Sequence, residues 1–255
     1  SILTRNISSS KGKAAGNADS FHERVAVRLD NNLSQTLSLD SQELIADDDF
    51  LVAFWYRFYG SAAGVAPFKT SSTLNGRGNA SNGTFRFNWS DSDAVDTTIN
   101  GMDGNWHFIT INIDQDGDMT VRQDLDGSES QPAETISVDI SGIADQDLEG
   151  EDFIWGNAIA DIDFNEIMVF KNWTAFATEL FGNAMHVVLQ QTTLGRNTQG
   201  VLDNAALPDP DWYYRINEGH SNIFNNTGVG SAPTMVLNYS GGIPNLDDLW
   251  IEGNV

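Results

Sequence analysis

Residues 103–127 constrain the fold more than any other part of this chain, because their order is typical of a β-hairpin. Trp106 leads a strand of β-branched and aromatic residues, a turn rich in Asp and Gly follows at residues 114–118, and a returning strand ends near Gly127. β-Branched and aromatic residues favour strands, and Asp and Gly favour the reversals between strands. The segment therefore predicts a pair of antiparallel strands.

Other segments carry strand patterns of two kinds. Apolar and polar residues alternate at residues 24–29 and again at 84–89, which is typical of a strand with one buried face. Residues 50–59 are apolar on both faces, which favours a place in the middle of a sheet. Two further strands are expected at 153–156 and 164–170. Short strands with turn residues between them predict an all-β protein, a two-sheet antiparallel β-sandwich.

One or two short helices are expected beside these strands. The best candidate starts near Asn172 or Thr174, which suit the start of a helix, and ends near Gly182. Three segments follow from the whole pattern. We expect a flexible N-terminal arm at residues 1–22, the sandwich at 23–185, and a C-terminal extension at 186–255 that packs on the sandwich or on a neighbouring subunit.

The charge balance excludes some partners. The chain of 255 residues has 36 acidic and 13 basic residues, a formal charge of −23, and no cysteine. Such a surface repels nucleic acid and anionic membranes, so neither is expected as a partner. The absence of cysteine excludes disulfides and Cys-ligated metals. The first residues have no apolar stretch of the signal-peptide kind, so we expect an unsecreted product.

Several motifs, in their order, resemble a known family. The hairpin at 103–127 and the strands at 26–30, 49–56 and 163–170 are similar to the laminin-G-like and pentraxin-like branch of the concanavalin A-like sandwiches. The resemblance covers residues 24–185. It implies a jelly-roll fold of two antiparallel sheets, and it permits a role in adhesion or glycan binding.

Two kinds of binding residue are predicted. Trp89 and Trp155 are candidates for stacking on sugar rings, provided that their rings are exposed, since aromatic residues on sandwich strands are usually core. Asp114, Asp116 and Asp118 are candidates for a calcium site, because clustered carboxylates suit that ion. Asp and Gly also suit a hairpin turn without any metal. No cofactor is expected, with calcium as the alternative.

A catalytic alternative comes from residues 161–166. This stretch resembles the E-x-D-x-x-E strand of laminarinase-type and lichenase-type glycoside hydrolases, in which the first carboxylate is the nucleophile and the last is the acid/base. Here the three positions are Asp161, Asp163 and Glu166. Asp161 is one methylene shorter than the Glu of the motif, which would misplace the attacking oxygen, so no catalytic residue is predicted.

These observations favour a non-enzymatic structural protein of a virion, a capsid-decorating or tail-associated protein of a phage. In this hypothesis the arm and the extension bind other virion proteins, and the lectin-like sandwich faces outward and binds host or environmental glycans at the virion surface. A homo-oligomer or a larger assembly is expected. The alternative is a free extracellular protein, either a lectin or a laminarinase-like glycoside hydrolase.

Overall fold

The computed structural model describes most of the sandwich and short parts of the C-terminal third. The described residues are 24–40, 49–60, 63–91, 93–125, 132–157, 159–172, 209–214, 216, 224, 228, 234–240 and 250–252. The predicted arm, the predicted helix beyond Asn172, and both domain boundaries lie outside these residues. In the part of the chain that is described, no helix has the length and hydrophobicity needed to cross a membrane.

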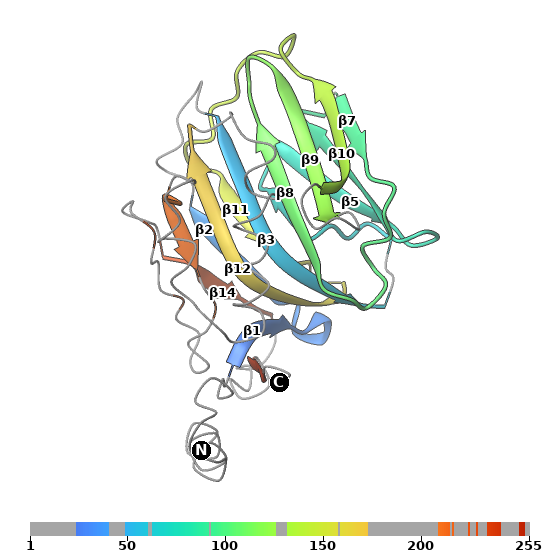
Figure 1. The fold of residues 1–255 in the computed structure, drawn as a ribbon. Coiled ribbons are helices and arrows are strands. Elements are labelled where there is room, and N and C mark those ends of the chain that lie inside the picture. Colours follow the sequence, from blue (N-terminus) through green and yellow to red (C-terminus); the bar gives the residue numbers. More distant parts are fainter. Residues whose placement is uncertain are drawn as a thin grey trace, which may run out of the picture.

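The described strands form one large sheet and two smaller ones, all antiparallel (Figure 1). The large sheet has eight strands in the order β10-β9-β8-β3-β12-β1-β15, with β13 also paired to β12. The bounds of its strands are β1 Arg24–Leu29, β3 Phe50–Tyr59, β8 His107–Ile113, β9 Asp118–Leu125, β10 Pro132–Asp139, β12 Asp161–Lys171, β13 Trp212–Tyr214 and β15 Trp250–Glu252.

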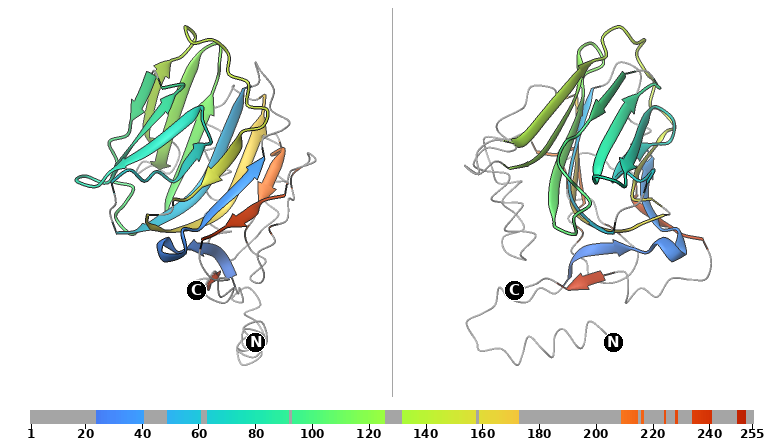
Figure 2. Two further views of the ribbon diagram at one scale, coloured as in Figure 1. Left: turned by 180° about the vertical axis from the view of Figure 1, so that it is seen from behind. Right: turned by 90° about the vertical axis from the view of Figure 1, so that its right-hand side faces the viewer.

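The two smaller sheets form the opposite layer. One has the order β14-β2-β11-β4 and the other has the order β5-β6-β7. Figure 2 shows them facing the large sheet, which makes the two-layer sandwich that the sequence predicts. Their bounds are β2 Thr36–Asp40, β4 Phe68–Thr70, β5 Leu74–Asn79, β6 Thr84–Trp89, β7 Asp93–Asp96, β11 Asp152–Trp155 and β14 Val236–Asn238, and a single 3-10 turn spans Asn31–Leu33 among the described residues.

The predicted hairpin and the predicted central strand are both confirmed. β8 and β9 pair antiparallel with Ile113 opposite Met119, and the turn between them contains Gly117. β3 lies between β8 and β12, in the middle of the large sheet. Its two faces bury different side chains, which explains why the segment is apolar on both sides.

The core lies between the two layers, and the period of two in each strand decides which residues enter it. In β3 the residues Phe50, Phe54 and Phe58 point inward and are fully buried. Phe54 meets aromatic rings of the opposite layer at centroid distances of 6.1 Å for Phe68 and 6.5 Å for Trp155. Burying one such side chain contributes about 1.5–3 kcal/mol, so this aromatic cluster holds the two layers together.

β12 contains a bulge that changes which side chains face outward. The register of β12 against β3 shifts between Asn165 and Met168, and Glu166 has a φ of 50°. Before the bulge Phe164 points into the core; after it Ile167 does. A bulge inserts one residue and so reverses the alternation of faces. Asp163 precedes the bulge and stands between two core residues, Ile162 and Phe164, so it lies on the outer face of the large sheet, which is the face turned away from the smaller sheets.

The C-terminal extension contributes strands to both layers. β13 pairs with the second half of β12, β15 pairs with β1, and β14 pairs with β2. The described parts of residues 186–255 are thus built into the sandwich by main-chain hydrogen bonds.

Candidate functional site

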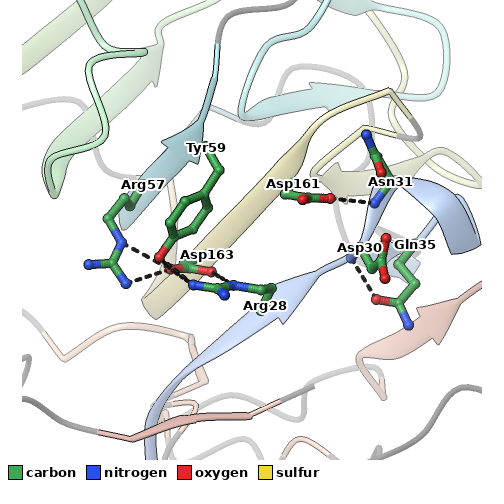
Figure 3. Close-up of polar contacts among 8 residues, drawn as sticks. All are labelled: Arg28, Asp30, Asn31, Gln35, Arg57, Tyr59, Asp161 and Asp163. Atoms are coloured by element: carbon green, nitrogen blue, oxygen red, sulfur yellow. Dashed lines mark hydrogen bonds and ion pairs between the residues drawn. The ribbon is translucent and has the colours of Figure 1, made fainter. Parts of the chain in front are cut away.

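A buried carboxylate organises the outer face of the large sheet. The side chain of Asp163 has no solvent-exposed surface, although it lies at the edge of a group of partly exposed residues. Its oxygen atoms accept hydrogen bonds from two arginines, as Figure 3 shows: Arg28 Nε donates to Oδ1 at 2.9 Å, and Arg57 Nη2 donates to Oδ2 at 2.7 Å. A carboxylate without water needs such charged partners, because an unpaired buried charge is strongly unfavourable.

Tyr59 completes the shell around Asp163. Its hydroxyl donates to Asp163 Oδ2 at 2.6 Å and also accepts a hydrogen bond from Arg28 Nη2. Burial, followed by the hydrogen bond and the charge of Asp163, raises the pKa of the Tyr59 phenol to about 12. The phenol therefore stays protonated at physiological pH and keeps donating to the carboxylate.

Aromatic rings lie against both guanidinium groups. The guanidinium carbon of Arg57 is 4.8 Å from the ring centroid of Trp106 and 5.1 Å from that of Tyr59, and the guanidinium carbon of Arg28 is 4.1 Å from the Tyr59 ring. Trp106, Arg57, Tyr59 and Arg28 thus form a series that we call the arginine–aromatic ladder. Each cation–π contact contributes about 0.5–1 kcal/mol at a partly exposed site and limits the movement of the guanidinium.

The ladder is open to solvent on one side. The side chain of Arg28 is 39% exposed and that of Arg57 is 18% exposed, and Tyr59 is among the large apolar or aromatic residues that remain exposed. In both arginines Nε and Nη2 make the contacts with Asp163. Each guanidinium therefore keeps Nη1 as a donor for which no partner is found in the described residues.

His107 stabilises the turn that contains Trp106. Its Nδ1 lies 2.6 Å from Asp124 Oδ2, and its Nε2 lies 2.8 Å from Asp103 Oδ1. Its ring also stacks on Tyr56 with a centroid distance of 5.5 Å. Burial alone would lower the His107 pKa, but the hydrogen bonds and charges of Asp124 and Asp103 outweigh it, so the pKa is raised. The charged imidazolium, which donates from both nitrogens, is the form that fits this contact.

We expect a pH dependence from this contact. A neutral imidazole can donate to only one of the two carboxylates. Because the folded pKa is raised, the stabilisation is fully present below about pH 6.5, the usual value for histidine, and is lost as the pH rises through the folded pKa. The melting temperature should therefore fall between pH 6.5 and pH 9, and thermal unfolding of His107→Asn should show a flatter dependence. Equal slopes in the two proteins would contradict this role.

The three carboxylates of the catalytic alternative are all engaged in structural contacts. Asp161 Oδ1 accepts the backbone N–H of Asn31 at 2.8 Å, and Asp163 is paired with the two arginines. Glu166 is 2% exposed and accepts a hydrogen bond from the hydroxyl of Tyr213. The strand brings the three residues to one region, as the motif implies, but Asp163 and Glu166 are buried, and only Asp161 is partly exposed.

The predicted calcium residues form a turn instead of a metal cluster. Asp114 and Asp118 close the β8–β9 turn through backbone hydrogen bonds, with Asp114 N donating to Asp118 O at 3.1 Å. No group of three or more His, Cys, Asp or Glu side chains that could hold a metal ion is found among the described residues, which include Asp114, Asp116 and Asp118. The structure therefore corrects this prediction: the acidic residues suit the turn and do not converge on an ion.

The predicted sugar-stacking residues lie in the core. Trp89 is 1% exposed and Trp155 has no exposed surface, and both belong to the cluster between the two layers. Exposure was the condition for that prediction and it is not met, because both side chains fall on the inward face of their strands. Neither ring presents a face to a ligand.

The ladder residues were not predicted from the sequence. One residue of the sequence does indicate a buried ion pair. Arg57 interrupts the apolar run of residues 50–59, and a charged residue inside a buried strand requires a partner of opposite charge. Asp163 is the matching carboxylate, but 106 residues separate the two in the chain. Only the pairing of β3 with β12 brings them into register.

No protein-family model matches the sequence, and no curated protein is similar to it. Several solved structures are similar to the fold. They include a heptameric SAP-like pentraxin from Limulus polyphemus, with a TM-score of 0.43 and 13% identity over 85% of this chain and 96% of that chain. The ligand-binding domain of botulinum neurotoxin serotype D has a TM-score of 0.47 and 10% identity over 90% and 72%. Domains LG4-5 of the mouse laminin alpha1 chain have a TM-score of 0.42 and 14% identity over 61% and 44%.

This chain spans less than half of the laminin fragment. The strand order of the chain itself defines the class: an all-β, two-layer antiparallel sandwich of the jelly-roll kind.

Proposed function

We propose that this protein is a non-enzymatic module that binds glycans at the arginine–aromatic ladder on the outer face of its large sheet. The observation that carries the proposal is the shell around Asp163. The fully buried carboxylate of Asp163 holds the guanidinium groups of Arg28 and Arg57 and the phenol of Tyr59 in place. All three of these side chains are partly exposed to solvent. Sugar-binding sites commonly combine aromatic surface with a few fixed hydrogen-bond donors, and the ladder has both.

The contacts of the three carboxylates favour glycan binding over glycan hydrolysis. Asp163 occupies the middle position of the E-x-D-x-x-E motif, and its charge is neutralised by two arginines. The other two carboxylates, Asp161 and Glu166, are hydrogen-bonded, and Glu166 is buried. Retaining hydrolysis needs one carboxylate free to attack and a second free to protonate the leaving oxygen.

A glycan-binding assay with one tryptophan variant and one tyrosine variant tests the proposal. Trp106→Ala should weaken glycan binding about tenfold, which corresponds to about 1.4 kcal/mol, because it removes the ring against Arg57. Tyr239→Ala is the matched control, since Tyr239 is also an exposed aromatic residue and lies next to β14 in the other layer. Affinity would be measured on immobilised polysaccharides, with circular dichroism to confirm the fold. Equal loss in both variants would overturn the site.

An activity assay addresses the hydrolase alternative. The protein is incubated with β-glucans, and reducing ends are measured over time. We expect binding without turnover. Turnover that disappears in Glu166→Gln would replace the binding proposal with an enzymatic one.

We further propose that the module works at the surface of an assembled particle, a virion, with the N-terminal arm and the C-terminal extension as its attachments. The formal charge of −23 supports this setting, because like-charged surfaces repel one another and keep particles dispersed. Deleting residues 1–20 should release the protein from its particle while glycan binding persists. Retention of the truncated protein on the particle would overturn the anchoring role.

A further inference from the structure

The exposed turn at residues 103–105 is tied to the sandwich through His107. Asp103 Oδ1 accepts the backbone N–H of Asn105 at 2.8 Å and also lies 2.8 Å from His107 Nε2. Asp103 Oδ2 accepts the side-chain amide of Asn105 at 2.9 Å. A Cβ built at Gly104 would contact nothing within 4 Å, so the tip of the turn is open. In the described part of the chain, the side-chain contact that leads from this turn to the sandwich is the one with His107.

On its other side His107 contacts a residue with an unusual backbone. The pairing of β8 with β9 ends at Ile109 and Gln123, and the next residue of β9, Asp124, has a φ of 53°. Asp124 Oδ1 accepts the backbone N–H of Phe108 at 3.0 Å, and Asp124 Oδ2 lies 2.6 Å from His107 Nδ1. A left-handed backbone at a residue other than glycine is strained, and such strain often marks a functional position. Here the strained backbone places a carboxylate against the imidazole.

The groups that face His107 favour its charged form. The carboxylate of Asp103 comes from its own turn and that of Asp124 comes from β9. Tyr56 of β3 stacks on the ring at 5.5 Å, and its phenol stays neutral because burial raises the pKa of Tyr56 well above its ordinary value. Glu134 of β10 adds a third negative charge that acts on Tyr56. The imidazolium therefore lies among negative charges and accounts for both of its N–H donors.

Loss of the proton affects the two carboxylates unequally. A neutral imidazole has one N–H and one lone pair. Asp124 makes the shorter contact with His107 and is also held by Phe108, so the remaining proton belongs on Nδ1. The lone pair of Nε2 then faces Asp103 Oδ1 at 2.8 Å, which is repulsive. Because the Asp103 side chain is 34% exposed, it can turn toward water, and the turn at residues 103–105 is released.

Trp106 connects this turn to the ladder. It follows the turn directly in the chain, and its ring centroid lies 4.8 Å from the guanidinium carbon of Arg57. Arg57 itself points to the outer face, where Asp163 holds it. We infer that the proton on His107 controls glycan binding: the imidazolium holds the turn at residues 103–105 and with it the Trp106 ring of the ladder, whereas the neutral imidazole releases both. The inference rests on the proposed glycan binding and makes His107 a positioning residue that does not contact the ligand.

The pH dependence of the affinity tests this control. The probe is a soluble neutral β-glucan, which has no titratable group, and calorimetry gives its affinity between about pH 6 and about pH 10. The affinity should fall about tenfold as the pH rises from about 6.5 through the raised pKa of His107. The Tyr59 phenol of the ladder, with a pKa of about 12, stays protonated throughout. Constant affinity over this range would overturn the inference.

Binding and proton uptake have to be reciprocal. If the protonated form binds the β-glucan more tightly, binding near the midpoint of the pH profile must take up protons. The uptake is measured from the binding enthalpy in two buffers with different enthalpies of ionisation. Binding that takes up no proton near the midpoint would contradict a link to His107.

Three variants assign the pH dependence to His107. His107→Asn should bind with one affinity at every pH, equal to that of the original protein at alkaline pH. Asp103→Asn removes one of the two charges that raise the His107 pKa, so the midpoint should move to lower pH. Asp96→Asn is the matched control, because Asp96 is an exposed carboxylate of the opposite layer that pairs with Arg86, and its midpoint should not move. Asp103 is exposed, so its variant tests the inference even if His107→Asn is unstable.

A measurement without ligand separates the inference from the function on which it rests. The protein is labelled with fluorotryptophan, and the fluorine resonance of Trp106 is assigned by its loss in Trp106→Phe. This resonance should titrate with pH in the original protein and not in His107→Asn. A resonance that stays constant with pH would overturn the release of the turn. Trp106-dependent glycan binding that is equal at all pH values would keep the proposed function and overturn its control by His107, and failure to bind any glycan would overturn both.

Discussion

Replacing Trp155 with alanine is expected to destabilise the protein by about 3–5 kcal/mol, the largest effect of any single change considered for this fold. The Trp155 indole has no exposed surface, and its ring lies 5.1 Å from that of Phe68 and 6.5 Å from that of Phe54, so it joins the two layers. A cavity of this size cannot be filled without moving both sheets. The melting temperature should fall by roughly 6–20 °C in a chain of this length, as measured by calorimetry.

Trp155→Phe provides the control. Trp155 Nε1 has no hydrogen-bond partner, so phenylalanine removes volume without breaking a hydrogen bond and should cost about 1–2 kcal/mol. Both variants should bind glycans like the original protein at temperatures where they are folded. A phenylalanine variant of normal stability with weakened glycan binding would instead mean that the indole contacts the ligand.

The fold could be predicted because each strand carries its own local signal. The alternation at residues 84–89 specifies a strand with one buried face, and the structure buries Phe85, Phe87 and Trp89 as the alternation requires. The apolar run at 50–59 has both faces covered, and β3 is a central strand. These signals depend only on neighbouring residues, since the side-chain period of a strand is two.

The site could not be predicted because its residues are brought together only by pairing between distant strands. Arg28 and Asp163 are 135 residues apart in the chain and meet because β1 pairs with β12. The residue type alone was misleading for Trp89 and Trp155, because a tryptophan binds a sugar or fills a core according to the face of its strand. The bulge at Glu166 added a further obstacle, since it reverses the alternation in the middle of β12.

Replacing Asp163 with asparagine is expected to destabilise the protein by about 2–4 kcal/mol and to weaken glycan binding as well. Asparagine has the same shape but no charge, and an NH2 donor replaces one of its two acceptor oxygens, so the two guanidinium groups lose their counter-charge and one of their acceptors. Removing one partner of a buried ion pair typically costs about 3–5 kcal/mol. The cost is lower here because the Arg28 and Arg57 side chains are 39% and 18% exposed and can turn toward water. Urea unfolding measures the loss of stability.

Asp161→Asn is the matched control, two residues earlier on the same strand. Asp161 Oδ1 accepts one backbone N–H, from Asn31, and the asparagine oxygen can accept the same bond, so the replacement should cost less than about 1 kcal/mol and leave binding unchanged. Trp155→Ala should lower only the stability, and Trp106→Ala should lower only the affinity for glycans. Asp163→Asn should lower both the stability and the affinity, because Asp163 positions the ladder residues without contacting the ligand itself. If Asp163→Asn matched Asp161→Asn in stability and affinity, the carboxylate would not be what orients the two arginines, and the binding site proposed for this face would lose its basis.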